Sequence, residues 1–305
     1  MATNGKLKCN HCPICNGRGC IGELPGLGGV FENKNFQLNC DGWNELRKQS
    51  EQNGTLKNLE QIQISPKNLR CGPVTGAEEN IGYKNEEDFY LPYFTAAFNS
   101  GIGICVGDGC PDLKLHLGIQ AIKSLKEKNA GKVEDVAFFL KPYPDEKLQE
   151  RFSWIKPYAS YIGIDIDSYN ILTLRNLVNL EKKTVNQLTE FRNQFEVPFV
   201  IKGVFTDEDL ELVKELKPNV IYISNHGGRV ETRVGSSAEF LQKHAAELKN
   251  YCDEIWVDGG IRTKEDVQTA IFYGADKVIL ARPFIRALFE NDIAGMEKFA
   301  KELFI

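Results

Sequence analysis

Short apolar runs alternate with amphipathic stretches along most of this chain. From about residue 60 onward, runs rich in β-branched and aromatic residues are followed by segments whose apolar positions recur at helical spacing. This alternation is typical of parallel βα units. Eight runs qualify as strands: QIQIS at 61–65 with GPVTG behind it, GIGICVG at 101–107, DVAFFL at 135–140, YIGIDID at 161–167, PFVIKGV at 198–204, VIYISN at 220–225, EIWVDGG at 254–260 and KVILA at 277–281. Because a TIM barrel has eight strands, we predict the α/β class and a (β/α)₈ barrel.

The helices between these runs have recognisable ends. Apolar residues fall at helical spacing from Leu113 to Leu125, and the stretch closes at Asn129 and Gly131. Thr206 followed by Asp209 predicts a capping box, and Thr263 followed by Asp266 predicts another. Each strand therefore leads into a loop on one common face, where barrel enzymes keep their chemistry.

An open, doubly wound sheet would give the same alternation of strands and helices. Such a sheet commonly carries G-x-G-x-x-G in its first strand-to-helix turn, and this chain does not. Its glycine- and arginine-rich turns follow the last two strands instead, where barrels commonly bind phosphate. The placement of these turns favours the barrel.

Composition narrows the class of protein. The 305 residues are 42% hydrophobic and 26% charged, with a formal net charge of −5, which argues against a nucleic-acid partner. The first residues have no apolar signal region, and no apolar run is long enough to span a membrane, so we expect a cytoplasmic protein that does not enter a membrane. Residues 31–305 are expected to form the barrel, and residues 1–30 an irregular cysteine-rich N-terminal arm.

Two turns near the C-terminus are suited to a phosphate monoester. V-D-G-G-I-R ends one strand at 257–262, and A-R-P follows the next at 281–283. Gly259 and Gly260 allow close approach of an anion to the backbone, and the helix that begins near Thr263 directs free N–H groups toward it. Arg262 and Arg282 add charged hydrogen-bond donors. A tight glycine turn with two solvated arginines is the alternative interpretation.

The preceding strand ends carry the candidate chemistry. His226 lies in S-N-H-G-G-R at 224–229, and an imidazole at a strand end can take up a proton near neutral pH. Arg229 can hold a carboxylate through two hydrogen bonds. Lys202, in I-K-G-V at 201–204, can stabilise negative charge.

In this order, I-K-G-V, S-N-H-G-G-R, V-D-G-G-I-R and A-R-P resemble the family of FMN-dependent α-hydroxy-acid oxidases and dehydrogenases, which includes glycolate oxidase, lactate oxidase and flavocytochrome-type lactate dehydrogenases. The resemblance covers roughly residues 60 to 290. It implies that His226 is the base, that Asp167 stabilises the charged form of His226, that Arg229 anchors the substrate carboxylate, and that Lys202 faces the flavin. It also implies FMN contacts at Pro73, Val74, Thr75, Lys202, Asp258, Gly259, Gly260, Arg262, Ala281 and Arg282.

The sequence departs from the family at several positions. Asp165 stands where the family usually has a flavin-contacting threonine. In the third strand, Phe139 and Lys141 align with the usual glutamine and tyrosine. Only Arg175 could supply the second substrate arginine, and Ala281 replaces a glycine before the last Arg-Pro. The substrate is therefore not fixed as glycolate or lactate.

Four cysteines crowd the N-terminal arm. Cys9, Cys12, Cys15 and Cys20 have the spacing C-x2-C-x2-C-x4-C, which suits Zn²⁺ and is close to that of an iron–sulfur cluster. Four reduced thiols are the alternative, because cytoplasmic cysteines stay reduced without a metal as well.

The leading functional hypothesis is FMN-dependent oxidation of a small 2-hydroxy acid, which makes a small carboxylate the expected partner. The alternatives are a flavin barrel isomerase similar to type 2 isopentenyl diphosphate isomerase and a flavin-binding regulatory protein without turnover. A homo-oligomer is compatible with the sequence.

Overall fold

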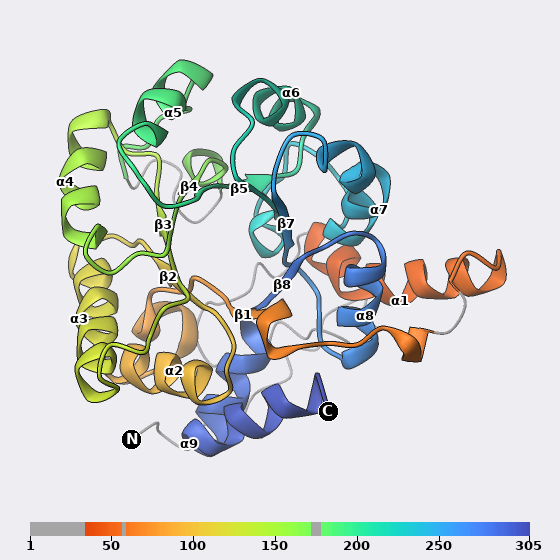
Figure 1. Cartoon of the computed structure of the whole chain (residues 1–305), viewed down its shortest axis with the longest axis horizontal. Helices are drawn as coiled ribbons and strands as arrows, with labels where there is room; N and C mark the ends of the chain where they lie inside the picture. The colour runs from red at the N-terminus through yellow and green to blue at the C-terminus, as the bar shows by residue number, and fades with distance from the viewer. Residues whose placement is uncertain (1–33, 57–58, 172–177) are drawn as a thin grey trace.

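The computed structural model describes residues 34–56, 59–171 and 178–305, in which eight parallel strands form a ring surrounded by helices (Figure 1). The strands are β1 (Leu69–Cys71), β2 (Ile104–Gly107), β3 (Val136–Leu140), β4 (Tyr161–Asp165), β5 (Phe199–Val204), β6 (Val220–Ile223), β7 (Glu254–Val257) and β8 (Lys277–Leu280). Their order in the sheet is β1-β8-β7-β6-β5-β4-β3-β2, and a parallel bridge between Arg70 and Gly103 closes the ring. The predicted (β/α)₈ barrel is confirmed, and the open sheet is excluded.

The helices lie on the outside of this ring. They are α1 (Lys34–Gln52), α2 (Glu87–Asn99), α3 (Leu113–Lys128), α4 (Asp145–Ile155), α5 (Val185–Arg192), α6 (Asp207–Leu216), α7 (Ser237–Leu248), α8 (Lys264–Phe272) and α9 (Arg282–Glu302). Both predicted capping boxes are present, at Thr206 and Thr263, and α3 ends at Asn129 as expected. Across the described ranges, none of the helices combines the length and apolar character needed to cross a bilayer.

The first predicted strand was misplaced. Residues 61–65 lie outside any strand, and β1 is the short segment Leu69–Cys71 directly before the GPVTG loop. QIQIS alternates apolar and polar residues as a half-exposed strand does, whereas barrel strands are buried on both sides. The strand that forms contains Arg70, a fully buried arginine whose Nη1 lies 2.6 Å from Asp135 Oδ1. From sequence alone an arginine is expected to be exposed, so this segment was not predicted as a buried strand.

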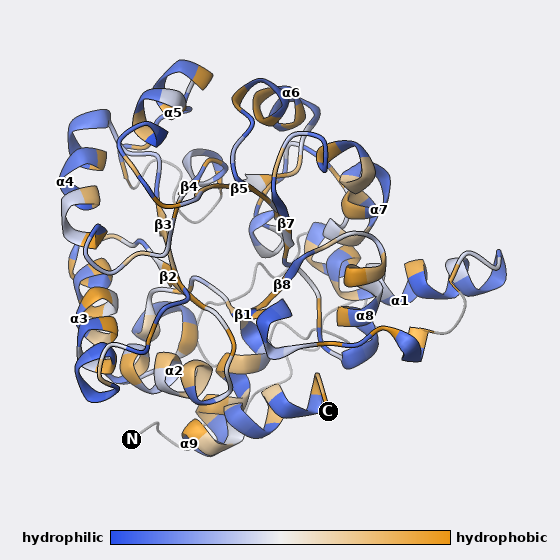
Figure 2. Ribbon diagram, in the orientation of Figure 1, coloured by the Kyte–Doolittle hydropathy of each residue, from blue (hydrophilic) through white to orange (hydrophobic). Residues whose placement is uncertain are grey.

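Two apolar layers hold the barrel together. The larger packs the outer faces of the strands against the helices, and the smaller fills the barrel interior around Phe139, Tyr222 and Trp256. Figure 2 shows the hydrophobic colour along the central strands and a mixture of both colours on the helices. Burial on both sides explains why most strands read as continuous apolar runs.

The inward-facing positions at the carboxyl ends of several strands carry charged side chains. Side chains two residues apart on a strand face the same side, so residues two positions beyond the interior ones also face inward. Phe139 is followed in this way by Lys141, Val200 by Lys202, and Trp256 by Asp258. Asp165 stands beside Lys202 in the β4–β5 register. Charged side chains therefore line the barrel interior at the carboxyl ends of the strands, next to the aromatic side chains that fill its centre.

The N-terminal helix α1, which the sequence pattern did not reveal, packs beside α7 and α8 and over the turns after β6 and β7 (Figure 1). Asn39 and Asn225 exchange side-chain hydrogen bonds of 2.7 and 3.0 Å, and the Ser237 backbone N–H donates to Asn39 Oδ1. A Cβ at Gly260 would collide with the Asn39 carbonyl oxygen. Thus α1 fixes the loop that carries His226.

We expect Asn39→Ala to lower the free energy of unfolding by about 2 to 4 kcal/mol, because it removes three buried hydrogen bonds, two with the Asn225 amide and one from the Ser237 backbone N–H. Asn44→Ala, on the same helix, removes a contact with Arg47 that lies nearer the surface and should change the free energy by less than about 0.5 kcal/mol. Urea unfolding of both variants measures the difference. Equal losses in the two variants would contradict the role given to Asn39.

Candidate active site

A cavity of about 430 Å³ lies at the carboxyl ends of the strands. Nearly all the site residues expected from the sequence line it: Pro73, Val74, Thr75, Lys202, His226, Arg229, Asp258, Gly259, Gly260, Arg262, Ala281 and Arg282. Asp167 does not line the cavity but contacts the His226 ring from behind. The barrel thus gathers strand ends that are distant in sequence around one space, as expected for the catalytic face of this fold.

A buried ion pair forms the floor of this cavity. Lys202 Nζ lies 2.5 Å from Asp165 Oδ1, and the two side chains are only 5% and 9% exposed. Burial raises the pKa of Asp165, but Lys202, His226 and other neighbours together hold that pKa below its usual value. Conversely, burial lowers the pKa of Lys202, while Asp165 and the other nearby carboxylates together raise it above normal. Both groups are charged at neutral pH.

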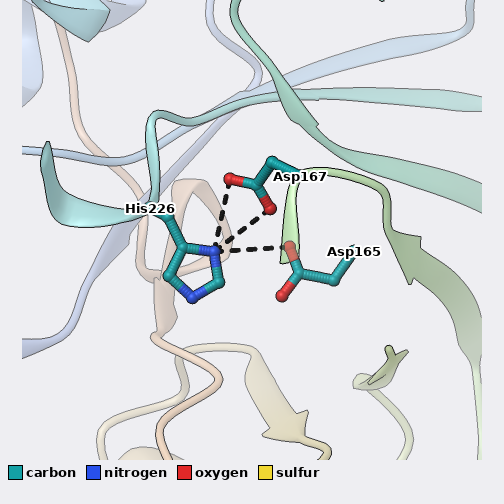
Figure 3. A group of neighbouring side chains, drawn as sticks. All are labelled: Asp165, Asp167 and His226. Carbon is teal, nitrogen blue, oxygen red and sulfur yellow. Dashed lines mark hydrogen bonds and ion pairs between the residues drawn. The ribbon is translucent and has the colours of Figure 1, made fainter. Parts of the chain in front are cut away.

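His226 lies beside this pair with its two ring nitrogens in different surroundings (Figure 3). Nδ1 lies 3.1 Å from Asp167 Oδ1 and 3.7 Å from Asp165 Oδ1, while the other nitrogen points away from both carboxylates. Burial, followed by the charge of Lys202, lowers the pKa of His226 well below its usual value. Burial and the charge of Asp165 raise the pKa of Asp167. The lowered pKa favours an uncharged imidazole at neutral pH, and Nε2 is the ring nitrogen turned away from the carboxylates.

Asp165, Asp167 and His226 also place one possible metal ligand each within 4.8 Å of one another. A metal ion there would have to share Asp165 with the Lys202 ammonium, which already occupies one of its oxygens. Two positive charges on one carboxylate repel each other at this range. The arrangement is better suited to acid–base chemistry than to metal binding.

Arg229 follows His226 on the same turn and lines the cavity. Its Nη1 donates a hydrogen bond to the His226 carbonyl oxygen. Burial, together with the nearby charge of Arg282, lowers the pKa of Arg229 to about 10. A carboxylate beside this guanidinium would relieve both effects. Arg229 can therefore fix an anionic group near His226.

The turns after β7 and β8 bring Arg262 and Arg282 to the cavity. Arg282 also stacks over the Phe36 ring of α1 at 4.5 Å and donates to the Gly227 carbonyl oxygen. Asp258 accepts a hydrogen bond from the Tyr222 hydroxyl at Oδ2, while its buried Oδ1 has no partner among the described residues. Cations beside an unused acceptor suit a ligand with both a phosphate and hydroxyl groups.

Glycine is required at positions 259 and 260 for a second reason besides anion binding. Gly259 and Gly260 have positive φ values of 96° and 79°. Side chains there would also meet α1, because a Cβ at Gly259 would lie 2.9 Å from Asn39 Nδ2. The helix therefore requires these glycines whether or not a phosphate is bound.

The sequence analysis did not predict the part of the cavity wall that follows β2. Asp108, Gly109 and Cys110 line it, as do Glu79 of the π-helical turn Ala77–Ile81 and Lys114 at the start of α3. The signal was available, because D-G-C-P follows a predicted strand directly, as the other candidate turns do. Arg175 and the cysteines Cys9, Cys12, Cys15 and Cys20 lie outside the described residues.

Residues 165–304 match the model of the family described as FMN-dependent dehydrogenase. The chain is 37% identical over 103 residues to 2-hydroxyacid oxidase 2 of Homo sapiens, across 34% of this chain and 29% of that protein. It is 39% identical over 116 residues to an L-lactate dehydrogenase of Allorhizobium ampelinum, across 37% of this chain and 30% of that protein. The chain therefore aligns with less than a third of the length of either relative.

Solved structures of mandelate oxidase share the fold. One, a variant with a bound phenylacetate derivative, has a TM-score of 0.64 and 22% identity, covering 93% of this chain and 89% of that one. Another, with (S)-mandelic acid, has a TM-score of 0.66 and 21% identity, covering 90% and 84%. Residues 165–304 are thus similar to the FMN-dependent α-hydroxy-acid oxidases and dehydrogenases.

Proposed function

We propose that this protein binds FMN and oxidises a small 2-hydroxy acid to the corresponding 2-oxo acid. The observation that carries the proposal is the arrangement around His226. An uncharged imidazole with one nitrogen on a carboxylate faces a cavity that also contains Arg229 and Lys202. A base, a carboxylate anchor and a buried cation in one space are what removal of hydrogen from a hydroxy acid requires.

The residues present fit FMN. Arg262 and Arg282 would hold its phosphate, and the unused Oδ1 of Asp258 would accept a hydrogen bond from a ribityl hydroxyl. The loop at Pro73, Val74 and Thr75 would offer backbone contacts to the flavin ring. Bound FMN would supply a two-electron acceptor for the hydride equivalent that leaves the substrate.

This chain's own residues position the substrate and move one proton. Arg229 holds the carboxylate, so that the hydroxyl-bearing carbon lies near His226 Nε2. That nitrogen takes one proton, and Asp167 beside Nδ1 stabilises the imidazolium that forms. Lys202, which stays protonated because of Asp165, would stabilise negative charge that develops on the bound FMN.

The two alternative functions are less well supported. The relatives named above are 2-hydroxyacid oxidases and lactate dehydrogenases, and none of them is an isomerase. A regulatory protein without turnover would have no need of a cavity-lining base whose pKa is held low and whose second nitrogen points away from the carboxylates.

We expect the protein to purify yellow with about one FMN per chain and Arg262→Ala to retain much less of it, because the phosphate loses a charged partner. Arg286→Ala is the matched control, since Arg286 lies on α9 with Glu290 and away from the cavity. Flavin released by acid is measured by absorbance and chromatography. Equal occupancy in the two variants, or release of a different nucleotide, would refute the assigned phosphate site.

We expect His226→Gln to keep FMN but to reduce it about 10² to 10⁴ times more slowly with any 2-hydroxy acid that reduces the wild type, because the proton acceptor is lost. His244→Gln on α7, away from the cavity, should leave the rate unchanged. Anaerobic stopped-flow absorbance follows the reduction. A wild-type rate in His226→Gln would rule out His226 as the base.

A further inference from the structure

Lys141 is the cavity residue that the mechanism leaves unused. It is the first residue after β3, next to Asp165 across the β3–β4 register, and it faces inward two positions beyond Phe139. Only 7% of the residue is exposed, and that part lines the cavity. A buried ammonium is costly unless an anion accompanies it.

The nearby carboxylates are already paired with other cations. Asp165 is bound by Lys202, and Asp108 lies 3.1 Å from Arg151 Nη1, with both of those side chains fully buried. Within the described residues, the Lys141 ammonium has no carboxylate within 4.0 Å and makes no side-chain hydrogen bond. Burial lowers the pKa of Lys141, and an anion brought into the cavity would offset this effect.

The other cations of the cavity have assigned partners. Lys114 lies 2.9 Å from Glu79, and Lys202 is paired with Asp165. Arg262 and Arg282 belong to the FMN phosphate in the proposed function, and Arg229 to the substrate carboxylate. Among the described residues, Lys141 is the cavity lysine without such a partner.

Lys141 lines the same cavity as Arg229 and His226. The charges of Lys141 and Arg229 both lower the pKa of the His226 imidazole. They reach it from different strands, Lys141 from the end of β3 and Arg229 from the turn after β6. A molecule with one anionic end on Arg229 can therefore place a second near Lys141.

We propose that Lys141 binds a second acidic group of the substrate, so that the 2-hydroxy acid oxidised at this site is a dicarboxylate. The inference rests on the proposed function for the reaction itself. It adds the substrate class, and it assigns a use to the lysine that replaces the family's tyrosine.

The test compares binding of two 2-oxo acids to the FMN-loaded protein by isothermal titration calorimetry. One is the dicarboxylate 2-oxoglutarate, and the other is the monocarboxylate 2-oxobutyrate. The wild type should bind the dicarboxylate about 10 to 100 times more tightly, as expected for one buried charged hydrogen bond. Lys141→Met should abolish this preference. Lys114→Met, the same change at a cavity lysine already paired with Glu79, should preserve it.

Equal affinities in the wild type would overturn the proposal without any variant. So would a preference that survives Lys141→Met, or a variant that loses FMN yet keeps the preference. If Lys141→Met does not fold, Lys141→Gln removes the same charge and keeps a polar group, and its expected result is identical. Because calorimetry needs no turnover, failure of the oxidation itself would appear separately, as a flavin that no 2-hydroxy acid reduces.

Discussion

The electrostatics of the whole site depend on the buried ion pair between Lys202 and Asp165. Each charge is tolerated at the carboxyl end of the barrel interior because the other lies 2.5 Å away. Breaking such a pair from one side typically costs about 3 to 5 kcal/mol, since the remaining charge is buried alone. Burial and the anionic Asp165 raise the pKa of Asp167, while burial and the cationic Lys202 lower that of His226 against the opposing charge of Asp165. The pair thus acts together with burial on the proposed base.

The loop that carries the base depends in turn on α1. The Asn39–Asn225 amide pair and the close approach of α1 to Gly260 tie the turns after β6 and β7 to one helix. Arg282 extends this contact by stacking on Phe36. Helix α1 therefore helps to position His226 and Arg229, although none of its own residues lines the cavity.

The sequence predicted the barrel and most of the cavity because both follow from local pattern. Strand ends in a parallel barrel converge, so glycine, histidine and arginine motifs placed there identify the lining. The failures involve contacts between distant segments. No local sequence pattern indicates that α1 contacts Asn225 and Gly260. The buried Arg70 interrupts the apolar pattern by which β1 would have been predicted. The pairing of Asp165 with Lys202 follows only once the β4–β5 register is known. For the same reason, an uncommitted charge at Lys141 becomes visible only when the neighbouring pairs are known.

The central claim is that His226 is an uncharged base whose Nδ1 faces Asp167 and whose Nε2 is free. Nitrogen NMR of the ¹⁵N-histidine-labelled protein tests it directly, because the chain has only four histidines and His226→Gln assigns the resonances. The account predicts a neutral imidazole protonated at Nδ1 at pH 7 that stays neutral well below pH 6.5, the ordinary histidine pKa. An imidazolium at pH 7, or a neutral ring protonated at Nε2, would contradict it.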